Sequence, residues 1–384
     1  MTYTERTNCI FCKNEVLETL LESDSSTSIS LGCLPGNERD DHVGSKIMIP
    51  YNIQHCKECN SCQTKYIGDL QIVYETNHLD NYGTTKTKKF EQFSKFILEN
   101  PCPDMNTLEI GACHTDMAEK ILQETTGTYT IIEPAITTHI HNPRLNIIND
   151  FFENVDIEHE PFDAIIMSDV FEHFYNPVEI IRKIQQSGIK YIYMNHPDFD
   201  YSITNNINVS LNIEHTFLIE HQFLFSLFEN HGFRLSKLKN FESQSLFLEF
   251  TRIPEDVSYN NLLLNINTLK NVKNHIYHLR EQSRIANEYM SNNPDKKYYI
   301  WPCSVHSATF FSFGFDYTKL TGICDNSPNK IGKYLNGYGL ECVSFDSMVK
   351  GGDNNDEACI FISSAGSYTK ELALTNPAVE LRFL

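Results

Sequence analysis

The sequence predicts an α/β protein whose central part is a doubly wound, Rossmann-like sheet, with a small metal-binding unit before it and a second, smaller Rossmann-like unit after it. Three observations lead to this prediction. Strand-length and helix-length apolar segments alternate between residues 106 and 250, five of the cysteines in the first 62 residues stand in C-x-x-C spacing, and a shorter alternation returns after residue 293. At roughly 150 residues per domain, the chain is long enough for two or three domains.

Composition and charge exclude several classes of function. With 41% apolar and 21% charged residues, the chain can bury enough surface to fold into compact domains. A formal net charge of -19 repels nucleic-acid backbones and anionic membranes. Neither a basic, apolar leader nor a bilayer-length apolar run occurs in the sequence. We therefore expect a cytoplasmic protein with no nucleic-acid or membrane partner.

The N-terminal segment, residues 1–75, predicts a zinc-binding domain. Its turn-rich sequence holds too few apolar residues for an independent core, so a metal would have to stabilise it. Two C-x-x-C turns each supply two thiolates at the spacing that tetrahedral zinc needs, and four sulfur ligands indicate a structural metal. The expected ligands are Cys9, Cys12, Cys56 and Cys59, although Cys62 forms a second C-x-x-C with Cys59 and leaves the register open.

The central segment, residues 76–255, carries the alternating pattern. A helix over Lys86–Leu98 ends before two prolines, and strands and helices follow in turn. The expected strands are Asn106–Gly111, Tyr129–Glu133, Phe162–Asp169, Lys190–Asn195 and Ser245–Phe250, and the expected helices are Asp116–Glu124, Pro177–Gln186 and Gln222–Asn230.

Two strand ends in this segment predict a nucleotide-binding edge. Gly111 lies in the turn after the first strand and Glu109 just before it, and Glu133 ends the next strand and is followed by Pro134. A carboxylate at the end of the second strand of such a sheet accepts hydrogen bonds from ribose hydroxyls. These four residues are therefore expected in a cofactor site.

A third apolar segment ends in Asp150 and Phe151. Because these two residues follow a third strand-like segment, they would stand at another carboxyl end of the same sheet. We therefore expect Asp150 to bond an adenine amine and Phe151 to cover the adenine ring. The competing interpretation of Asp150 is a solvated loop carboxylate.

The C-terminal segment, residues 256–384, begins with apolar residues at spacings of three and four, which predict a long linking helix up to about residue 295. The buried-strand patterns Tyr298–Pro302, Leu320–Asp325 and Ala358–Ser363 follow, separated by helix-length segments. They indicate the smaller Rossmann-like domain.

The segment Ser168–Pro177, which reads Ser-Asp-Val-Phe-Glu-His-Phe-Tyr-Asn-Pro, resembles the fourth-strand motif of S-adenosylmethionine-dependent methyltransferases. Across the whole chain the resemblance extends to the sugar C-methyltransferases of deoxysugar biosynthesis, which have a zinc domain, a methyltransferase domain and a Rossmann-like domain. Their zinc motif, C-x-x-C followed by Gly-x-x-Gln, is similar to Cys56–Gln63 with Asn60 at the glycine, which favours Cys56 and Cys59 over Cys62. Their C-terminal signature looks like Asp325–Gly332.

This resemblance implies a set of catalytic residues. The family's catalytic Glu-His pair matches Glu214 and His215, about seventeen residues before a His-Gly-Phe. The helper residues would be His173, Asp169 and Tyr82, with Asp169 also beside the cofactor. The competing interpretation of His173 is that it only packs beside the cofactor. The competing interpretation of His215 is that it is an ordinary loop histidine.

Some positions depart from the family. Asn212 replaces a tyrosine three residues before the catalytic histidine, and the Glu172-His173 pair is more usual in O-methyltransferases. A second Glu-His pair ends in His221 and offers an alternative base.

The resemblance implies the cofactors S-adenosylmethionine and structural Zn²⁺, and a nucleotide-linked deoxysugar as substrate. The expected reaction is C-methylation at C3 beside a 4-keto group, with His215 as general base. The alternative is O- or N-methylation of a sugar hydroxyl or amine in surface-glycan biosynthesis.

Overall fold

The computed structural model describes residues 3–23, 26–28, 33–34, 48–74, 84–99, 102–136, 141–207, 210–242, 245–254, 266–350, 358–363 and 379–384. Two seven-stranded sheets and one four-stranded sheet dominate the described chain, and two small antiparallel pairs accompany them. These pairs are β1 (Tyr3–Glu5) with β8 (Tyr66–Gly68), and β3 (Ser26–Ser28) with β5 (Met48–Pro50).

The central sheet has the strand order β11-β10-β9-β12-β13-β16-β15. Its first five strands in sequence are parallel, which confirms the doubly wound prediction for this part, whereas β16 runs antiparallel to both of its neighbours, β13 and β15. The expected strand Ser245–Phe250 is thus present as β16, but the interpretation of the whole sheet as parallel was wrong for this strand, because the short β15–β16 connection permits only an antiparallel hairpin. The strands are β9 (Thr107–Ile110), β10 (Tyr129–Ile132), β11 (Leu145–Ile148), β12 (Ala164–Ser168), β13 (Tyr191–Pro197), β15 (Phe233–Phe241) and β16 (Ser245–Arg252).

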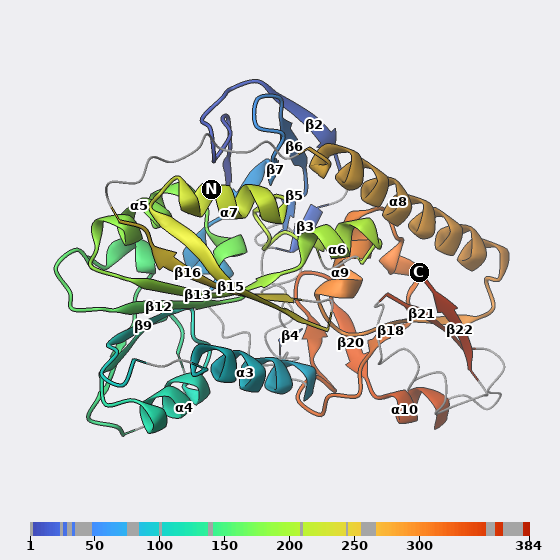
Figure 1. Cartoon of the computed structure of the whole chain (residues 1–384). Coiled ribbons are helices and arrows are strands. Elements are labelled where there is room, and N and C mark those ends of the chain that lie inside the picture. Colours follow the sequence, from blue (N-terminus) through green and yellow to red (C-terminus); the bar gives the residue numbers. More distant parts are fainter. Residues whose placement is uncertain are drawn as a thin grey trace.

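Helices cover both faces of the central sheet (Figure 1). The helices α3 (Thr84–Ile97) and α4 (Asp116–Glu124) lie on one face, and α5 (Pro177–Gln186) and α7 (His221–Glu229) lie on the other. All four helices were predicted to within two residues at their ends. A proline at the first position of α5 has the fixed φ and missing N–H that a helix start tolerates.

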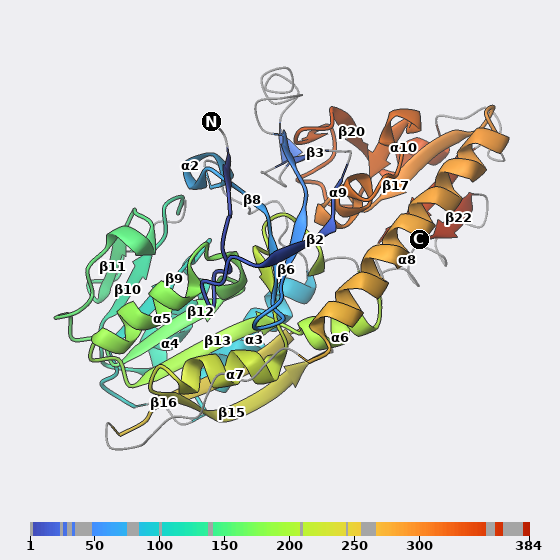
Figure 2. The same ribbon diagram turned by 90° about the horizontal axis from the view of Figure 1, so that it is seen from above.

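The N-terminal segment builds a four-stranded sheet with the order β14-β7-β6-β2. Its strands β2 (Leu17–Leu21), β6 (Ile53–Cys56) and β7 (Cys62–Thr64) come from this segment, but β14 (Phe217–Leu218) comes from the central one. Figure 2 shows these blue strands between the green central sheet and the orange C-terminal segment. The N-terminal unit is thus hydrogen-bonded directly to a loop of the central unit.

The C-terminal sheet has the order β22-β21-β17-β18-β20-β19-β4, with parallel pairing from β22 to β20. The strand β4 (Cys33–Leu34) joins it from the N-terminal segment. Its other strands are β17 (Lys297–Trp301), β18 (Gly322–Cys324), β19 (Tyr334–Leu335), β20 (Leu340–Val343), β21 (Ala358–Ile362) and β22 (Glu380–Phe383). The remaining helices are α2 (Leu70–Val73), α6 (Phe199–Thr204), α8 (Thr268–Asn292), α9 (Val305–Ser312) and α10 (Phe345–Lys350).

The linking helix is α8, and residues 256–265 of the predicted range lie outside the described residues. Its buried Val272, Ile276 and Leu279 join a core that also holds apolar residues of the N-terminal and C-terminal sheets. None of the helices in the described ranges combines the length and apolarity that crossing a bilayer requires.

Candidate functional site

A cavity of about 240 Å³ opens at the carboxyl edge of the central sheet, where the strands β9, β10 and β12 end. In a doubly wound sheet this edge is where ligands bind. The residues that line the cavity are Leu70, Tyr74, Ile110, Gly111, Cys113, Ile132, Glu133, Pro134, Ala135, Phe151, Phe152, Glu153, Asp169, Val170, His173, Phe174 and Glu214. Leu70 and Tyr74 were not predicted from the sequence, because they come from α2 and its end and not from the sheet.

Gly111 forms a close contact between the first strand end and the loop after β12. Its φ of +72° lies in the left-handed region, and a Cβ atom there would stand 2.6 Å from Cγ2 of Val170. The absence of a side chain lets the β9 turn approach Val170, and both residues line the cavity.

The two glutamates expected at the nucleotide edge have different environments. Glu133 lines the cavity, and its Oε1 accepts a hydrogen bond of 2.9 Å from the N–H of Ala135. Glu109 is buried within the sheet, where Tyr129 Oη donates to its Oε2 at 2.9 Å. Burial raises the pKa of Glu109 to about 8. Glu109 is not among the residues lining the cavity, because its side chain turns toward the neighbouring strand.

The third strand end contributes an aromatic ring to the cavity. Phe151 lines the cavity, and its ring centroid lies 6.2 Å from that of Tyr74. Asp150 is not a lining residue, since its Oδ1 accepts hydrogen bonds from the N–H of Phe151 and from Asn154 Nδ2, both at 2.7 Å. The structure therefore gives Asp150 a loop-ordering contact, and the bond to an adenine amine stays a prediction.

Asp169 lies at the carboxyl end of β12 in a backbone conformation unusual for a residue with a side chain. Its φ is +54°, and strain of this kind concentrates at functional sites. Its carboxylate forms an ion pair with Lys89 of α3 and accepts a hydrogen bond of 3.1 Å from Asn195 Nδ2. Lys89 was not predicted from the sequence, since it is far from Asp169 in the chain.

Two histidines from separate loops meet beside the cavity. His173 belongs to the 3-10 helix Phe171–His173 and His215 to the loop before β14, and their ring centroids lie 5.4 Å apart. Asn212 Oδ1 accepts hydrogen bonds from the N–H groups of Glu214 and His215, at 2.8 and 3.1 Å. Burial lowers the pKa of His215 to about 4, so its imidazole is neutral near pH 7.

Glu172 lies beneath this pair of histidines. The side chain is fully buried, and within the described part of the chain neither carboxylate oxygen has a hydrogen-bond partner. Burial, followed by the charge of Asp169, raises the pKa of Glu172 well above its usual range. Its Oε1 lies 3.8 Å from His173 Nε2. Because the raised pKa favours the protonated acid, Glu172 adds no negative charge beside the imidazoles.

The other proposed catalytic residues have distinct positions. Glu214 lines the cavity, and Tyr82 lies outside the described residues. The alternative base His221 begins α7, where Asp200 Oδ2 lies 3.1 Å from its Nδ1, and neither His221 nor His215 is a lining residue. The carboxylate of Glu220 accepts from the N–H of Thr268 at 2.8 Å, so this second Glu-His pair is engaged in holding helix ends.

The ionisable side chains that line the cavity are mainly carboxylates. Its described lining includes the carboxylates of Glu133, Glu153, Asp169 and Glu214 and contains no lysine or arginine. Such a cavity favours a cationic ligand group and disfavours a phosphate, unless the phosphate brings its own counter-ion.

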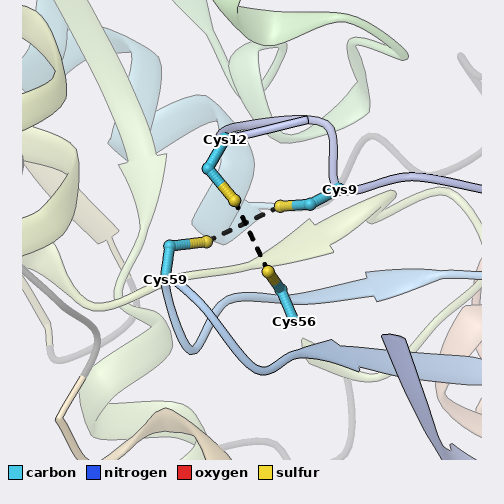
Figure 3. Close-up of side chains that lie close together, drawn as sticks. All are labelled: Cys9, Cys12, Cys56 and Cys59. Carbon is cyan, nitrogen blue, oxygen red and sulfur yellow. Dashed lines mark hydrogen bonds between the residues drawn. The ribbon is translucent and has the colours of Figure 1, made fainter. Parts of the chain in front are cut away.

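Four cysteines form a second cluster, in the N-terminal unit. Figure 3 shows Cys9 and Cys12 on one loop and Cys56 and Cys59 on the β6–β7 turn, with all four sulfurs directed toward one another. The sulfurs of Cys9 and Cys59 lie 3.6 Å apart, and those of Cys12 and Cys56 lie 3.5 Å apart. In a tetrahedral site with Zn–S bonds of about 2.3 Å, sulfurs are about 3.8 Å apart. The donor set and its dimensions fit zinc.

The two cysteine turns have the same backbone geometry. The residue after each turn, Lys13 or Asn60, has a left-handed φ of 62° or 58°. Asparagine tolerates this conformation better than most residues, which explains how Asn60 replaces the glycine of the family motif. Gln63 joins the turns, because its Oε1 accepts from the N–H of Ile10 and its Nε2 donates to the carbonyl of Asn8, both at 3.0 Å.

Cys62 is not part of this cluster. It precedes Gln63 on β7, and successive strand residues point to opposite faces. Its side chain packs into the core beside α8, whereas Cys9, Cys56 and Cys59 share the core of the central unit. The structure thus brings together the four cysteines first expected from the sequence.

No family model matches the sequence, and comparison with curated proteins returns no match. Among solved structures, the chain is similar to 1,6-didemethyltoxoflavin-N1-methyltransferase of Burkholderia thailandensis, at 9% identity over 52% of this chain and 99% of that one, with a TM-score of 0.38. It is also similar to the N-methyltransferase NodS of Bradyrhizobium japonicum WM9, at 11% identity over 45% and 89%, with a TM-score of 0.33. It is also similar to magnesium protoporphyrin IX methyltransferase of Synechocystis PCC 6803, at 8% identity over 44% of this chain and 80% of that one, with a TM-score of 0.34.

Overlaps of such low similarity assign no activity to this chain. Its own strand order and the cavity at the carboxyl edge define its class, a doubly wound α/β protein with a ligand site at the strand ends.

Proposed function

We propose that this protein is a methyltransferase that uses S-adenosylmethionine, and that its acceptor is a nucleotide-linked deoxysugar. The observation that carries the proposal is the acidic cavity at the strand ends, with the His173–His215 pair beside it. A nicotinamide or flavin dinucleotide would bring a pyrophosphate into a lining that presents the carboxylates of Glu133, Glu153 and Glu214 besides that of Asp169, which is paired with Lys89. A sulfonium cofactor carries the charge that this lining favours.

The topology supports the same class. Five parallel strands, β9 to β13, are followed in the sequence by β15 and β16, and β16 is inserted between β13 and β15. This strand order is typical of class I methyltransferases and differs from the dinucleotide-binding order. The sheet therefore favours methyl transfer over hydride transfer.

The residues that would hold the cofactor are those at the first three strand ends. Glu133 offers carboxylate oxygens to a ribose, Gly111 allows close backbone approach, and Phe151 and Tyr74 offer apolar cover for a ring. When bound, the cofactor supplies a methyl group on a sulfonium that leaves as a neutral thioether.

We propose zinc for the four-cysteine cluster. A site with four sulfur ligands leaves no open position, so the metal would have a structural role. The sulfur–sulfur distances of 3.6 Å between Cys9 and Cys59 and 3.5 Å between Cys12 and Cys56 support this proposal.

On the acceptor side, we assign the proton abstraction to His215. Removal of a hydrogen from the carbon beside a ketone near neutral pH needs a positioned base and a partner for the enolate oxygen. His215 is neutral near pH 7, and His173 lies close enough to the same space to serve that oxygen. The electron pair left on C3 would then take the methyl group. O- or N-methylation stays the alternative, because a hydroxyl or amine acceptor needs the same alignment but no enolate.

An exchange experiment separates the two reactions. The enzyme is incubated in heavy water with a 4-keto deoxysugar nucleotide and S-adenosylhomocysteine, so that no methyl group is transferred. The expected result is exchange of the C3 hydrogen, and a fall of about 10² to 10⁴ in its rate in His215→Ala.

The matched control is His221→Ala: neither His221 nor His215 lines the cavity, but the ring of His215 lies beside that of the lining residue His173, whereas the ring of His221 stacks on Phe225. Undiminished exchange in His215→Ala would reject His215 as the base. Methylation of a sugar without any keto group would replace carbon chemistry by the O- or N-methyl alternative. A chain that neither binds S-adenosylhomocysteine nor consumes S-adenosylmethionine would reject the methyltransferase itself.

A further inference from the structure

Arg6 is a buried cation at the junction of the N-terminal and central units. It follows β1 and precedes the first cysteine turn, and only 7% of its surface is exposed. In the described part of the chain it forms no ion pair with a carboxylate. Its guanidinium donates to the carbonyl of Thr216 at 2.7 Å, to the carbonyl of Tyr175 at 3.0 Å, and to Oγ1 of Thr64 at 3.1 Å.

These carbonyls belong to the two loops that carry the histidines. Thr216 directly follows His215, and Tyr175 is two residues after His173. One planar guanidinium therefore joins both histidine loops to β7, with the fixed fork of donors that only arginine has.

The two loops are also joined to each other through Thr216. Its N–H donates to the carbonyl of Glu172 at 3.0 Å, and its Oγ1 donates to the carbonyl of Phe174 at 2.8 Å. Its carbonyl accepts from Arg6 and from the N–H of Thr64 at 3.0 Å, just before β14 pairs with β7. The N-terminal unit thus fixes the relative position of the histidine loops through main-chain contacts.

We infer that Arg6 is a positioning residue for the His173–His215 pair, so that the four-cysteine unit forms part of the active site and is not a separate module. The inference rests on the proposed function for the role of this pair in proton transfer. Burying a guanidinium with only neutral acceptors is costly, and an apolar side chain would fill the same space more cheaply. The guanidinium, however, donates to carbonyls of both histidine loops at once, which an apolar side chain could not do.

The test compares Arg6→Lys and Arg6→Met with the wild-type enzyme. Lysine keeps the charge but has no fork, and methionine keeps much of the length without polar contacts. The matched control is Lys65→Met, since the carbonyl of Lys65 accepts from the N–H of Arg6 at 2.8 Å but its side chain pairs with the exposed Glu5 at 3.2 Å. Turnover, affinity for S-adenosylhomocysteine and the effect of added guanidinium ion are measured for each.

We expect turnover to fall about tenfold in Arg6→Lys and about a hundredfold in Arg6→Met, because a displacement of the reacting groups by about 1 Å has an effect of this size. Cofactor affinity should change less than about twofold, since Arg6 does not line the cavity. Guanidinium ion should restore part of the turnover of Arg6→Met only.

A second readout does not depend on methyl transfer. In protein labelled with ¹³C-histidine, His215, assigned from the spectrum of His215→Gln, should stay neutral down to about pH 5 in the wild type and in Lys65→Met. In Arg6→Met the loosened loop should let it titrate toward its ordinary pKa of about 6.5. This shift can be seen even if no sugar is methylated, so that failure of the proposed function stays distinguishable.

The inference is overturned if Arg6→Met folds with wild-type turnover and an unchanged His215 titration. If Arg6→Met does not fold, Arg6→Lys decides by the same two readouts. Unfolding of both variants would assign Arg6 to the stability of the chain as a whole and would also overturn the positioning role.

Discussion

Gly111→Ala should disrupt the cofactor edge through two separate effects. The left-handed φ of +72° costs an alanine roughly 1 to 2 kcal/mol. The new Cβ would also stand 2.6 Å from Cγ2 of Val170, whose β-branched side chain has few alternative rotamers. Overpacking of this kind costs about 1 to 3 kcal/mol. The sum is about 2 to 5 kcal/mol, concentrated where β9 meets the loop after β12.

The assay should be local, because the only tryptophan lies in the C-terminal sheet and would not report on this turn. Hydrogen exchange of peptides that cover β9 and α4 measures the local free energy of opening. Calorimetry with S-adenosylhomocysteine measures the affinity of the cavity for this ligand. We expect the affinity to weaken about tenfold or more, because displacement of Val170 alters the cavity wall.

Two further variants separate the contributions. Gly188→Ala is the matched control, since no atom lies within 4 Å of the position that its new methyl group would take and its backbone needs no left-handed φ. In Gly111→Ala with Val170→Ala, the steric part should disappear and about 1 to 2 kcal/mol of backbone strain should remain. If Gly111→Ala exchanges and binds like Gly188→Ala, the close approach of these two loops is not what shapes the site.

The other predictions concern the metal, the ribose contact and a buried acid. Cys56→Ser with Cys59→Ser should abolish the roughly one zinc per chain expected from four ligands, as elemental analysis would detect, whereas Cys62→Ser should retain it. Glu133→Ala should weaken S-adenosylmethionine binding by about 1.5 to 3 kcal/mol in calorimetry, and unchanged affinity would move the ribose site elsewhere. Glu109 has a pKa of about 8 in the fold and about 4.5 when unfolded, so the folded state binds the extra proton and stability should fall as pH rises from 4.5 to 8. Denaturant unfolding of Glu109→Gln should lose this pH dependence.

The sequence predicted most of the central fold because its apolar segments match the lengths of buried strands and helices. The ends of α4 and α5 were predicted to the residue. The antiparallel edge was not foreseen, because a buried strand such as β16 has the same apolar pattern whichever way it runs. Nor could the pairing of β14 with β7 be found, since two residues carry no strand pattern.

For the site, the sequence identified the right strand ends but not which side chains turn inward. Glu109 and Glu133 both stand near a carboxyl end, yet the hydroxyl of Tyr129 holds Glu109 inside the sheet. Lys89 pairs with Asp169 across eighty positions of chain, so no local motif reveals it. The four cysteines were predictable because a tetrathiolate metal site has a characteristic ligand type and C-x-x-C spacing, whereas an ion pair has neither.

The two asparagines that depart from the family pattern have different consequences for chemistry. Asn60 adopts the left-handed conformation of the glycine that it replaces, so the cysteine cluster keeps its geometry. Asn212 takes the place of a tyrosine and uses its oxygen to order the loop of His215, and it therefore offers no hydroxyl to an enolate. If carbon is methylated, the donor to that oxygen has to come from another residue, and we propose His173, whose ring centroid lies 5.4 Å from that of His215. Under the proposed function, carbon methylation thus requires His173 to donate a hydrogen bond to the enolate oxygen, whereas methylation of a hydroxyl or amine does not.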